Sequence, residues 1–469
     1  MLTPSNDAAH NITLELSQSF ITSSVFLWFL DNNIFEEIDR NSNHETKELA
    51  LQLSIDYNTF ERFLRLLSAN SILKKNKGRY SLNISLQEIL ALKSLELSKL
   101  YNDINDILMN TQLKKEMLDE EAITLNHILD LLYNYKGTHL QVVFMFIISR
   151  IIIFVSTIDL ESIIGSGLTI KEFSNHLHMP IDTVNRLARL LCDHYIINLD
   201  HGIIKNNTLT KTLPWVLTPH ITESYNLFSH IDYTIRNNES AWSYVYGSNF
   251  YGYLSSNPVK SKIFNNWCSL SAVGWLEAVL LWCKFPKSKI VIDIGGGSGS
   301  FIQKVLDLNP EIDGVLFDQE STINNIDPLY FSKYENRIDL VSGDFFNDRT
   351  IPPNGDIYII CRTLLNWSNN DAVTIINNCA SRMPKHAKII IVDFIIPDIT
   401  HPKYQRAVLN DISLYTIMDS GIRTKAEWME IISKTKLHLI SFKMTNEAKL
   451  PNMHKPYYPM CFIELSLDQ

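Results

Sequence analysis

KIVIDIGGGSGS, residues 289–300, is the stretch that decides the fold of this chain. The apolar run 289–293 ends in an acid, as buried parallel strands often do, and Phe301–Leu308 has a helical pattern. The loop between them holds four glycines, Gly295, Gly296, Gly297 and Gly299. Glycines let backbone N–H groups and the positive end of a helix approach a carboxylate, a sugar or a phosphate closely. The stretch therefore predicts a strand, a binding loop and a helix.

Two phosphate-binding patterns do not fit this loop. A dinucleotide fingerprint needs a third glycine, and counted from Gly295 that position holds Ser300. A P-loop ends in Gly-Lys-Ser or Gly-Lys-Thr, and the stretch has neither ending. The loop is therefore expected to hold a ligand without gripping a phosphate.

Two further strand ends supply groups that suit a nucleoside. The strand-like run 314–317 ends at Asp318, roughly where an acid meets a ribose in a βαβ nucleotide site. A third run, 338–341, leads to Asp344 and Phe345, which offer a carboxylate for an adenine amino group beside an aromatic face. Together the three strand ends predict a nucleoside site.

At this point the chain resembles the class I S-adenosylmethionine-dependent methyltransferases, and within them the caffeate-type and bacterial natural-product O-methyltransferases. Six segments match the family in order and spacing: VIDIGGGSG (291–299), GVLFDQ (314–319), SGDFF (342–346), GDIYIICRTLLNWSNNDA (355–372), IIIVDFIIPD (389–398) and SGIRTKAEW (420–428). The resemblance implies S-adenosylmethionine as cofactor. It places Gly295, Gly296 and Gly297 at the methionine part, Asp318 at the ribose, Asp344 and Phe345 at the adenine, and Arg362 at the cofactor's outer edge.

The chain departs from the family at the catalytic histidine. Family members deprotonate a phenolic hydroxyl with the histidine of an L-H-D-W motif, because a poised imidazole makes the oxygen a better nucleophile. In RTLLNW (362–367), Leu365 stands at the histidine position and Asn366 at the aspartate position. Of the family's two acids beside that histidine, one matches Asp393 and the other falls on Ile422. The candidate catalytic residues are therefore Asp393 and Asn366.

Three functions remain open from the sequence. The first is methyl transfer by proximity to a small molecule, such as a natural-product intermediate, whose acceptor is an amine, an ionised oxygen or an activated carbon. In the second, the cofactor site serves a different reaction or a structural purpose. In the third, the chain is a winged-helix regulator or binding protein. His230 and Tyr251 are further candidates to replace the histidine, on chemistry alone.

Composition narrows the setting in which the protein works. The chain has 469 residues, 45% of them apolar and 20% charged, and a net charge of −9, which argues against affinity for nucleic acid or anionic membranes. Six scattered cysteines without a C-x-x-C pair predict reduced thiols in the cytoplasm and no structural metal.

The N-terminus lacks the pattern of a secretory signal. Val142–Val155 is too short to span a membrane and carries Arg150, so a buried helix is expected.

An internal repeat precedes the glycine loop. At an offset of 124 residues, FERFLRLL (60–67) aligns with VNRLARLL (184–191), and the segments on either side also agree. Each copy has the outline of a winged helix-turn-helix. Neither would-be recognition helix is a basic stripe, which favours a structural or dimerising role over DNA binding. In the resembled family one such module serves dimerisation and closes the substrate pocket, so a homodimer is expected.

The predicted fold is a mainly α N-terminal region with two winged-helix repeats, followed by an α/β Rossmann-like doubly wound methyltransferase domain. The expected parts are a first repeat (1–90), a helical connector (91–140), a second repeat (141–212), a helical substrate-pocket and dimerisation segment (213–286) and the S-adenosylmethionine-binding domain (287–469).

Overall fold

The computed structural model divides the chain into two compact units, Met1–Val245 and Tyr246–Gln469. It describes residues 20–41, 45–114, 117–134, 139–207, 209–210, 221–264, 276, 279–280, 283, 285, 289–334, 336–445 and 458–467. Residues 1–19, where no secretory signal is expected, Cys268 and part of the predicted segment 213–286 lie outside these ranges. Within them, no helix is both long and apolar enough to cross a bilayer.

The first unit contains the two predicted repeats, each a buried helix followed by three further helices and then a small hairpin. The first repeat consists of α2 (Phe20–Asp31), α3 (Ile34–Arg40), α4 (Thr46–Gln52), α5 (Tyr57–Ala69), β1 (Leu73–Asn76) and β2 (Arg79–Leu82). The second consists of α9 (Met145–Ser156), α10 (Leu160–Ile164), β3 (Leu168–Thr169), α11 (Ile170–Leu177), α12 (Ile181–Asp193), β4 (Asn198–Asp200) and β5 (Ile203–Lys205). The expected buried helix is therefore α9, in which Arg150 is only 1% exposed.

Backbone conformation repeats along with the sequence. Left-handed residues recur 124 positions apart at the ends of equivalent helices, in the pairs Ser54 and His178, and Ser71 and Tyr195. The hairpin turns agree as well, since Gly78 and Gly202 have φ angles of 81° and 79°. Residues in this conformation are uncommon unless they are glycine, so matched pairs indicate the same chain path twice. The prediction of two winged-helix repeats is confirmed.

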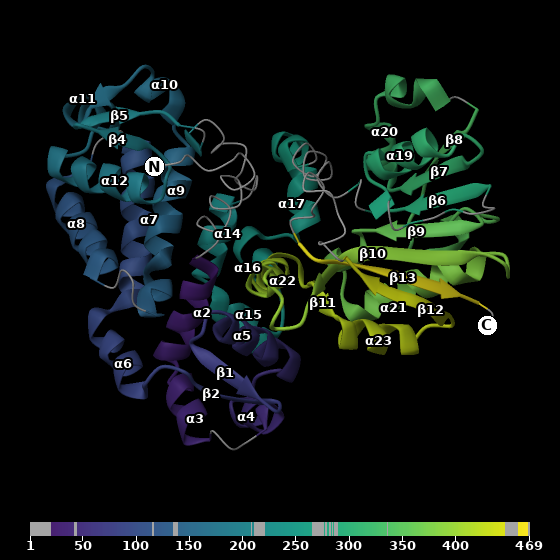
Figure 1. Ribbon diagram of the computed structural model, residues 1–469, viewed down its shortest axis with the longest axis horizontal. Helices are drawn as coiled ribbons and strands as arrows, with labels where there is room; N and C mark the ends of the chain where they lie inside the picture. The colour runs from purple at the N-terminus through teal and green to yellow at the C-terminus, as the bar shows by residue number, and fades with distance from the viewer. Residues whose placement is uncertain are drawn as a thin grey trace. The chain divides into compact units, whose positions relative to one another are not determined.

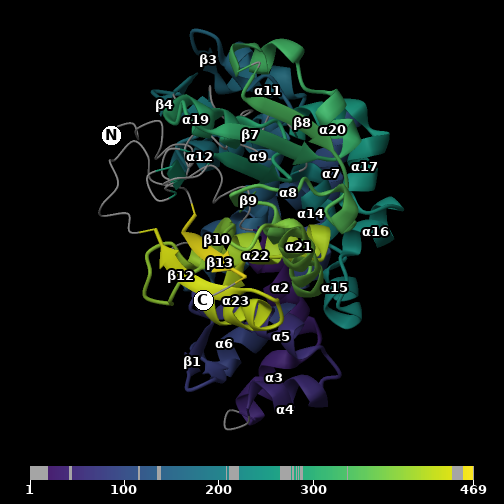
Figure 2. The same cartoon turned by 90° about the vertical axis from the view of Figure 1, so that its right-hand side faces the viewer.

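Helices connect and follow the repeats. Between them lie α6 (Leu86–Ala91), the 3-10 helix η1 (Leu92–Leu95), α7 (Leu97–Lys114), α8 (Asp119–Asn134) and the 3-10 helix η2 (His139–Phe144). After them come α14 (Ile221–Phe228), α15 (Ile231–Asn237), α16 (Ala241–Tyr246) and α17 (Phe250–Ser256). In both views the two hairpins lie at opposite ends of this unit, with α2, α7 and α9 between them (Figure 1, Figure 2).

The second unit is built on an eight-stranded sheet in the order β12-β13-β10-β9-β6-β7-β8, with β11 beside β10. Its strands are β6 (Ile290–Ile294), β7 (Asp313–Asp318), β8 (Ile338–Ser342), β9 (Ile357–Cys361), β10 (Lys388–Ile396), β11 (Arg423–Thr424), β12 (His438–Met444) and β13 (Met460–Ser466). Strands β6 to β10 run parallel, whereas β13 is antiparallel to both β10 and β12. The order reverses at β6, which in doubly wound sheets is the switch point beside the ligand crevice.

Helices cover the sheet, and the apolar core lies between the helices and the strands. They are α19 (Ser300–Leu308), α20 (Glu320–Asn324), α21 (Asn369–Arg382), α22 (Tyr404–Met418) and α23 (Lys425–Ser433), with the 3-10 helices η3 (Pro328–Tyr334), η4 (Asp348–Thr350) and η5 (Leu364–Asn366). Ile292, Ile294 and Ile391 belong to the apolar cluster that includes α21 and α23, which lie together in Figure 1. Because side chains alternate along a strand, Asp293 points to the opposite face, where α19 packs against β6 and β7. The predicted α/β doubly wound domain is confirmed.

Candidate active site

Three glycines of the loop between β6 and α19 have a left-handed backbone conformation. Gly295, Gly297 and Gly299 have φ angles of 68°, 60° and 78°. A Cβ on Gly296 would lie 2.4 Å from Leu316 Cδ1 and 2.5 Å from the Asp293 carboxylate. On Gly297, by contrast, a Cβ would meet no atom within 4 Å. The loop is therefore tightly packed on the protein side and open beyond Gly297, where backbone N–H groups can approach a ligand.

Asp318, at the end of β7, is joined directly to this loop. Its Oδ2 accepts a hydrogen bond from the Gly297 N–H at 2.8 Å, and its Oδ1 accepts one from the Gln319 N–H at 2.7 Å. The Gly295 N–H donates to the Phe317 carbonyl at 2.8 Å. A carboxylate has about four acceptor positions, so Asp318 keeps capacity for the hydroxyls of a ribose. Two predicted binding elements thus meet at one strand edge.

The third predicted element follows β8, which pairs with β7 so that Ser342 lies opposite Asp318. Asp344 is exposed, and its Oδ1 accepts from the Phe346 N–H at 2.9 Å. The Phe345 ring meets Phe346 and Trp367 edge-on, with centroids 5.2 and 5.5 Å away. A carboxylate and an aromatic group therefore stand beside the Asp318 edge, as a nucleoside site requires.

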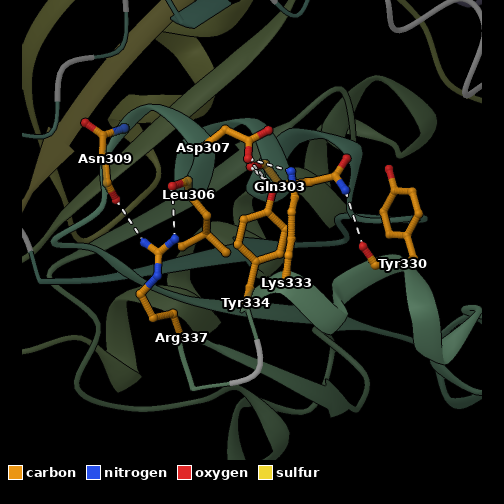
Figure 3. Close-up of polar contacts among 8 residues, drawn as sticks. All are labelled: Gln303, Leu306, Asp307, Asn309, Tyr330, Lys333, Tyr334 and Arg337. Atoms are coloured by element: carbon orange, nitrogen blue, oxygen red, sulfur yellow. Dashed lines mark hydrogen bonds and ion pairs between the residues drawn. The ribbon is translucent and has the colours of Figure 1, made fainter.

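Helix α19 is anchored at its far end by polar contacts with η3 and the residue that precedes β8 (Figure 3). Lys333 Nζ lies 2.8 Å from the Asp307 carboxylate, which also accepts a hydrogen bond from the Tyr334 hydroxyl. Arg337 donates to the carbonyls of Leu306 and Asn309 at 3.2 and 3.1 Å. These contacts hold α19, and with it the N-terminal turn that follows the glycine loop, in a fixed direction.

Arg362 is placed beside β10. Its backbone has a φ of 54°, its N–H donates to the Val392 carbonyl at 2.7 Å, and its guanidinium lies 4.5 Å from the centre of the Phe394 ring. The structure thus groups Arg362 with the Asp393 end of the sheet. Its predicted contact with the outer edge of a cofactor stays a prediction.

The position of the family's histidine is filled by a buried leucine. Leu365 in η5 is 5% exposed, and Ile422, at the position of the second acid, is 1% exposed. Asp393 on β10 is fully buried, and the backbone N–H of Leu365 faces its carboxyl group. Asn366, the next residue along η5, is half-buried. The residues that the sequence assigns to the catalytic position therefore do lie together, with an apolar side chain where the imidazole would stand.

The two further candidates for the missing base give no comparable geometry. His230 lies in the first unit, where its ring contacts Tyr244 with centroids 5.9 Å apart. Tyr251, on α17, is 41% exposed and contacts Phe250. Neither contact indicates a catalytic role.

Comparison with known proteins shows which family the region around this site matches. Residues 228–436 match the family model of the O-methyltransferase domain. These residues belong to that family. The chain is 28% identical over 233 residues to the phenazine O-methyltransferase PhzM of Lysobacter antibioticus, covering 50% of this chain and 67% of that protein. It is 30% identical over 205 residues to the O-demethylpuromycin-O-methyltransferase of Streptomyces alboniger, covering 43% and 53%.

Solved structures share the fold of about two-thirds of the chain. The structure of LaPhzM matches with a TM-score of 0.53 and 22% identity, covering 67% of this chain and 94% of that one. The mitomycin 7-O-methyltransferase MmcR matches with a TM-score of 0.55 and 20% identity, covering 67% and 92%. In sequence, the chain spans roughly half to two-thirds of the length of the curated relatives named above.

Two buried groups of the O-methyltransferase domain were missed by sequence reasoning. Arg423 is 3% exposed and donates to the Leu364 and Trp367 carbonyls at 2.8 and 2.6 Å, so it holds both ends of η5. Asp411 on α22 is fully buried and accepts from the Ile422 N–H at 2.9 Å. Arg423 lies within the matched segment 420–428, but the pattern around Asp411 gives no sign that the carboxylate is buried. Among the described residues, no cluster of histidine, cysteine or acidic side chains could hold a metal.

The carboxyl groups of Asp293 and Asp393 both have a pKa well above the usual range, so each keeps a large share of its protons up to about neutral pH. Burial is the main cause, and it raises the pKa of each carboxyl from 3.8 to about 7. The charges of Asp318 near Asp293 and of Arg423 near Asp393 act in opposite directions on the two groups. The atom Oδ2 of each has no hydrogen-bond partner among the described residues. A neutral carboxyl tolerates that environment, whereas a carboxylate does not.

These raised pKa values predict that the stability of the domain falls as the pH rises from about 4 to about 7. In that range the folded chain keeps protons that the unfolded chain releases, so the stabilising contribution is complete below the unfolded pKa and lost above the folded pKa. Asp393→Asn, which mimics the protonated form, should melt at a higher temperature than the wild type at pH 8 and nearly equally at pH 5. Thermal unfolding at both pH values measures this. Asp339→Asn, at an exposed position, is the control. It should have the same melting temperature as the wild type at both pH values.

Proposed function

We propose that this chain is an S-adenosylmethionine-dependent methyltransferase that acts on a small molecule, such as a natural-product intermediate. The observation that carries the proposal is the junction of the glycine loop with Asp318 beside an aromatic strand end, within a domain of the O-methyltransferase family. The printed names of the relatives, which include phenazine and puromycin O-methyltransferases, support a small natural product as the substrate class.

The residues present fit the cofactor. The open side of Gly297 and the backbone N–H groups beside it suit the carboxylate of the methionine part, with Gly295 and Gly296 shaping the turn. Asp318 would accept hydrogen bonds from the ribose, Asp344 from the adenine amino group, and Phe345 would cover the base. When bound, S-adenosylmethionine supplies a sulfonium methyl group for transfer.

The acceptor chemistry follows from Leu365. A buried leucine cannot take up a proton, so the chain is not equipped for the histidine-assisted methylation of a neutral phenol. We therefore assign it an acceptor that is already nucleophilic: an amine, an ionised oxygen or an activated carbon. Such an acceptor needs mainly to be aligned with the methyl group. We assign this role to η5, which Arg423 holds in place by hydrogen bonds to its backbone, as the side of the site against which the acceptor packs. Asp393 and Asn366 are proposed to orient η5 and the acceptor.

The same leucine also favours a second candidate, in which the bound cofactor serves a reaction other than methyl transfer. The two are separated by incubating the full chain with S-adenosylmethionine and a panel of amines, carboxylic acids, acidic enols and phenols, and by measuring S-adenosylhomocysteine. Release with amines or acidic acceptors supports the proposal. Turnover of neutral phenols alone would contradict it, and tight cofactor binding without any release would favour the second candidate.

Substitution of Asp393 tests the mechanism. Proton transfer by a general base contributes about 10²- to 10⁴-fold to a rate. Because the proposal requires no base, Asp393→Asn should lower kcat at pH 7 by less than about tenfold, and the dependence of kcat on pH should keep its shape. Asn366→Ala serves as the matched variant from η5. A fall in kcat of a hundredfold or more with Asp393→Asn, together with loss of a pH step near 7, would instead make Asp393 the base.

The homodimer and the cytoplasmic location expected from the sequence stay predictions.

A further inference from the structure

The two winged-helix repeats contact each other through equivalent residues. Helices α2 and α9 share the pattern Phe-Ile-x-Ser, with Phe20 and Ser23 lying 126 positions before Phe146 and Ser149. The Phe20 N–H donates to Ser149 Oγ at 3.0 Å, and the Phe146 N–H donates to Ser23 Oγ at 3.2 Å. Exchanging the two repeats turns one hydrogen bond into the other. Reciprocity of this kind is the mark of a two-fold interface, in which residue i contacts j and j contacts i.

Aromatic rings continue the same symmetry. Tyr101 on α7 and Tyr225 on α14 are equivalent at the spacing of 124, and their rings stack on one another with centroids 5.0 Å apart and planes within 3°. Phe20 packs on Tyr225 at 4.9 Å, and its equivalent Phe146 packs on Tyr101 at 5.2 Å. Two equivalent residues can stack directly only where an approximate two-fold axis passes between them. The axis therefore runs between Tyr101 and Tyr225.

Whole helices obey the exchange as well. Helix α7, which follows the first hairpin, packs on α9 of the second repeat, and α14, which follows the second hairpin, packs on α2 of the first. The hairpins consequently lie at opposite ends of the unit (Figure 1, Figure 2). Every side chain of the reciprocal set is buried: Phe20, Ser23, Tyr101, Phe146, Ser149 and Tyr225 are each at most 4% exposed.

We propose that the two winged-helix repeats, together with α7 and α14, form a fused dimer, in which each repeat is the other's partner and closes its self-association surface within a single chain. Because this face is buried within the chain, a second copy of the chain cannot bind to it. Pairing within the chain is favoured because covalent linkage gives the two repeats a high effective concentration for one another. This proposal stands against the homodimer through this module that the sequence predicts.

One departure from symmetry favours the pairing of unlike repeats. The equivalent of Ser24 in α2 is Arg150 in α9, and the Arg150 guanidinium lies over the Tyr225 ring, 5.7 Å from its centre. Arg150 is 1% exposed, and burial lowers its pKa. If second repeats from two copies paired, two buried guanidiniums would meet across the axis, which is unfavourable. Pairing of unlike repeats buries only one guanidinium, so the first repeat is the better partner for the second.

Engineered cysteine pairs in the full chain test the proposal. Phe20→Cys with Ser149→Cys, and separately Ser23→Cys with Phe146→Cys, place thiols on the residues that form the two symmetry-related hydrogen bonds. After oxidation we expect both pairs to be linked within one chain, in a non-reducing gel band at the mass of 54.0 kDa, with the joined peptides identified by mass spectrometry. The four single variants and the wild type, oxidised in the same way, are the controls for the native cysteines.

Each outcome decides. Linkage of both pairs within the single-chain band supports the fused dimer. Linkage in a band of twice that mass would show that the repeats pair between copies and would overturn it. Absence of linkage from both pairs, in variants whose thermal unfolding shows that they are folded, would show that the reciprocal surface does not form and would overturn it equally.

Discussion

Replacing Gly296 with alanine should weaken S-adenosylmethionine binding by about a hundredfold or more. The added Cβ would lie 2.4 Å from Leu316 Cδ1 and 2.5 Å from the Asp293 carboxylate, distances that real Cβ atoms do not adopt. Both groups are buried and have little room to shift, so we expect the loop to move away from β6, and with it the Gly297 N–H, which donates to Asp318 at 2.8 Å. Such a displacement disrupts both the glycine loop and the position of Asp318, the carboxylate assigned to the ribose. Calorimetric titration of the variant with S-adenosylmethionine measures the loss.

Gly202→Ala is the matched control for this variant. Unlike Gly296, Gly202 has a positive φ, 79°, and a Cβ there meets no atom within 4 Å; the residue lies in the hairpin of the second repeat. The substitution therefore adds backbone strain without a clash, and cofactor affinity should stay at the wild-type value. A folded Gly296→Ala variant that binds S-adenosylmethionine as tightly as the wild type would contradict the placement of the site at this loop.

Replacing Arg423 with methionine should lower the stability of the domain by about 3 to 5 kcal/mol. The guanidinium is buried, and it donates to the carbonyls of Leu364 and Trp367 and to the side chain of Asn369 at 2.6 to 2.8 Å. Methionine fills much of the same volume but leaves these acceptors without donors, and buried unsatisfied acceptors are costly. Chemical unfolding followed by the fluorescence of the domain's tryptophans measures the loss.

Arg337→Met provides the comparison for Arg423→Met. Arg337 also donates to several backbone carbonyls, those of Leu306 and Asn309 (Figure 3) and those of Pro310 and Ile312. Its side chain, however, is partly exposed. Water can replace its hydrogen bonds, so the expected loss is about 1 kcal/mol. Equal losses for the two variants would show that the burial of Arg423 does not set its contribution.

The parts of this fold that the sequence predicted are those with a local signal. The glycine loop was visible because glycine readily adopts the backbone conformations that a tight turn needs. Gly295, Gly297 and Gly299 indeed have positive φ angles. The repeats were visible because matched apolar positions recur at one offset, and the equivalent helices α5 and α12 each have 13 residues. The leucine at position 365 was identified because six neighbouring segments fixed the alignment around it.

What the sequence did not show depends on contacts between distant segments. An alignment of repeats says that two modules are alike but not which faces they present to each other, so the stacking of Tyr101 on Tyr225 could not be anticipated. The burial of Asp411 likewise depends on how α22 packs on β10, which no residue type announces. The predicted domain boundaries stay predictions, and the division of the chain into two compact units falls between Val245 and Tyr246.

Calorimetric titration of the full wild-type chain with S-adenosylmethionine tests the central claim most directly. If the carboxyl ends of β6, β7 and β8 form the cofactor site, the titration should give saturable heat with one site per chain, a raised melting temperature, and competition by S-adenosylhomocysteine. Absence of both heat and thermal stabilisation at saturating cofactor would contradict the account.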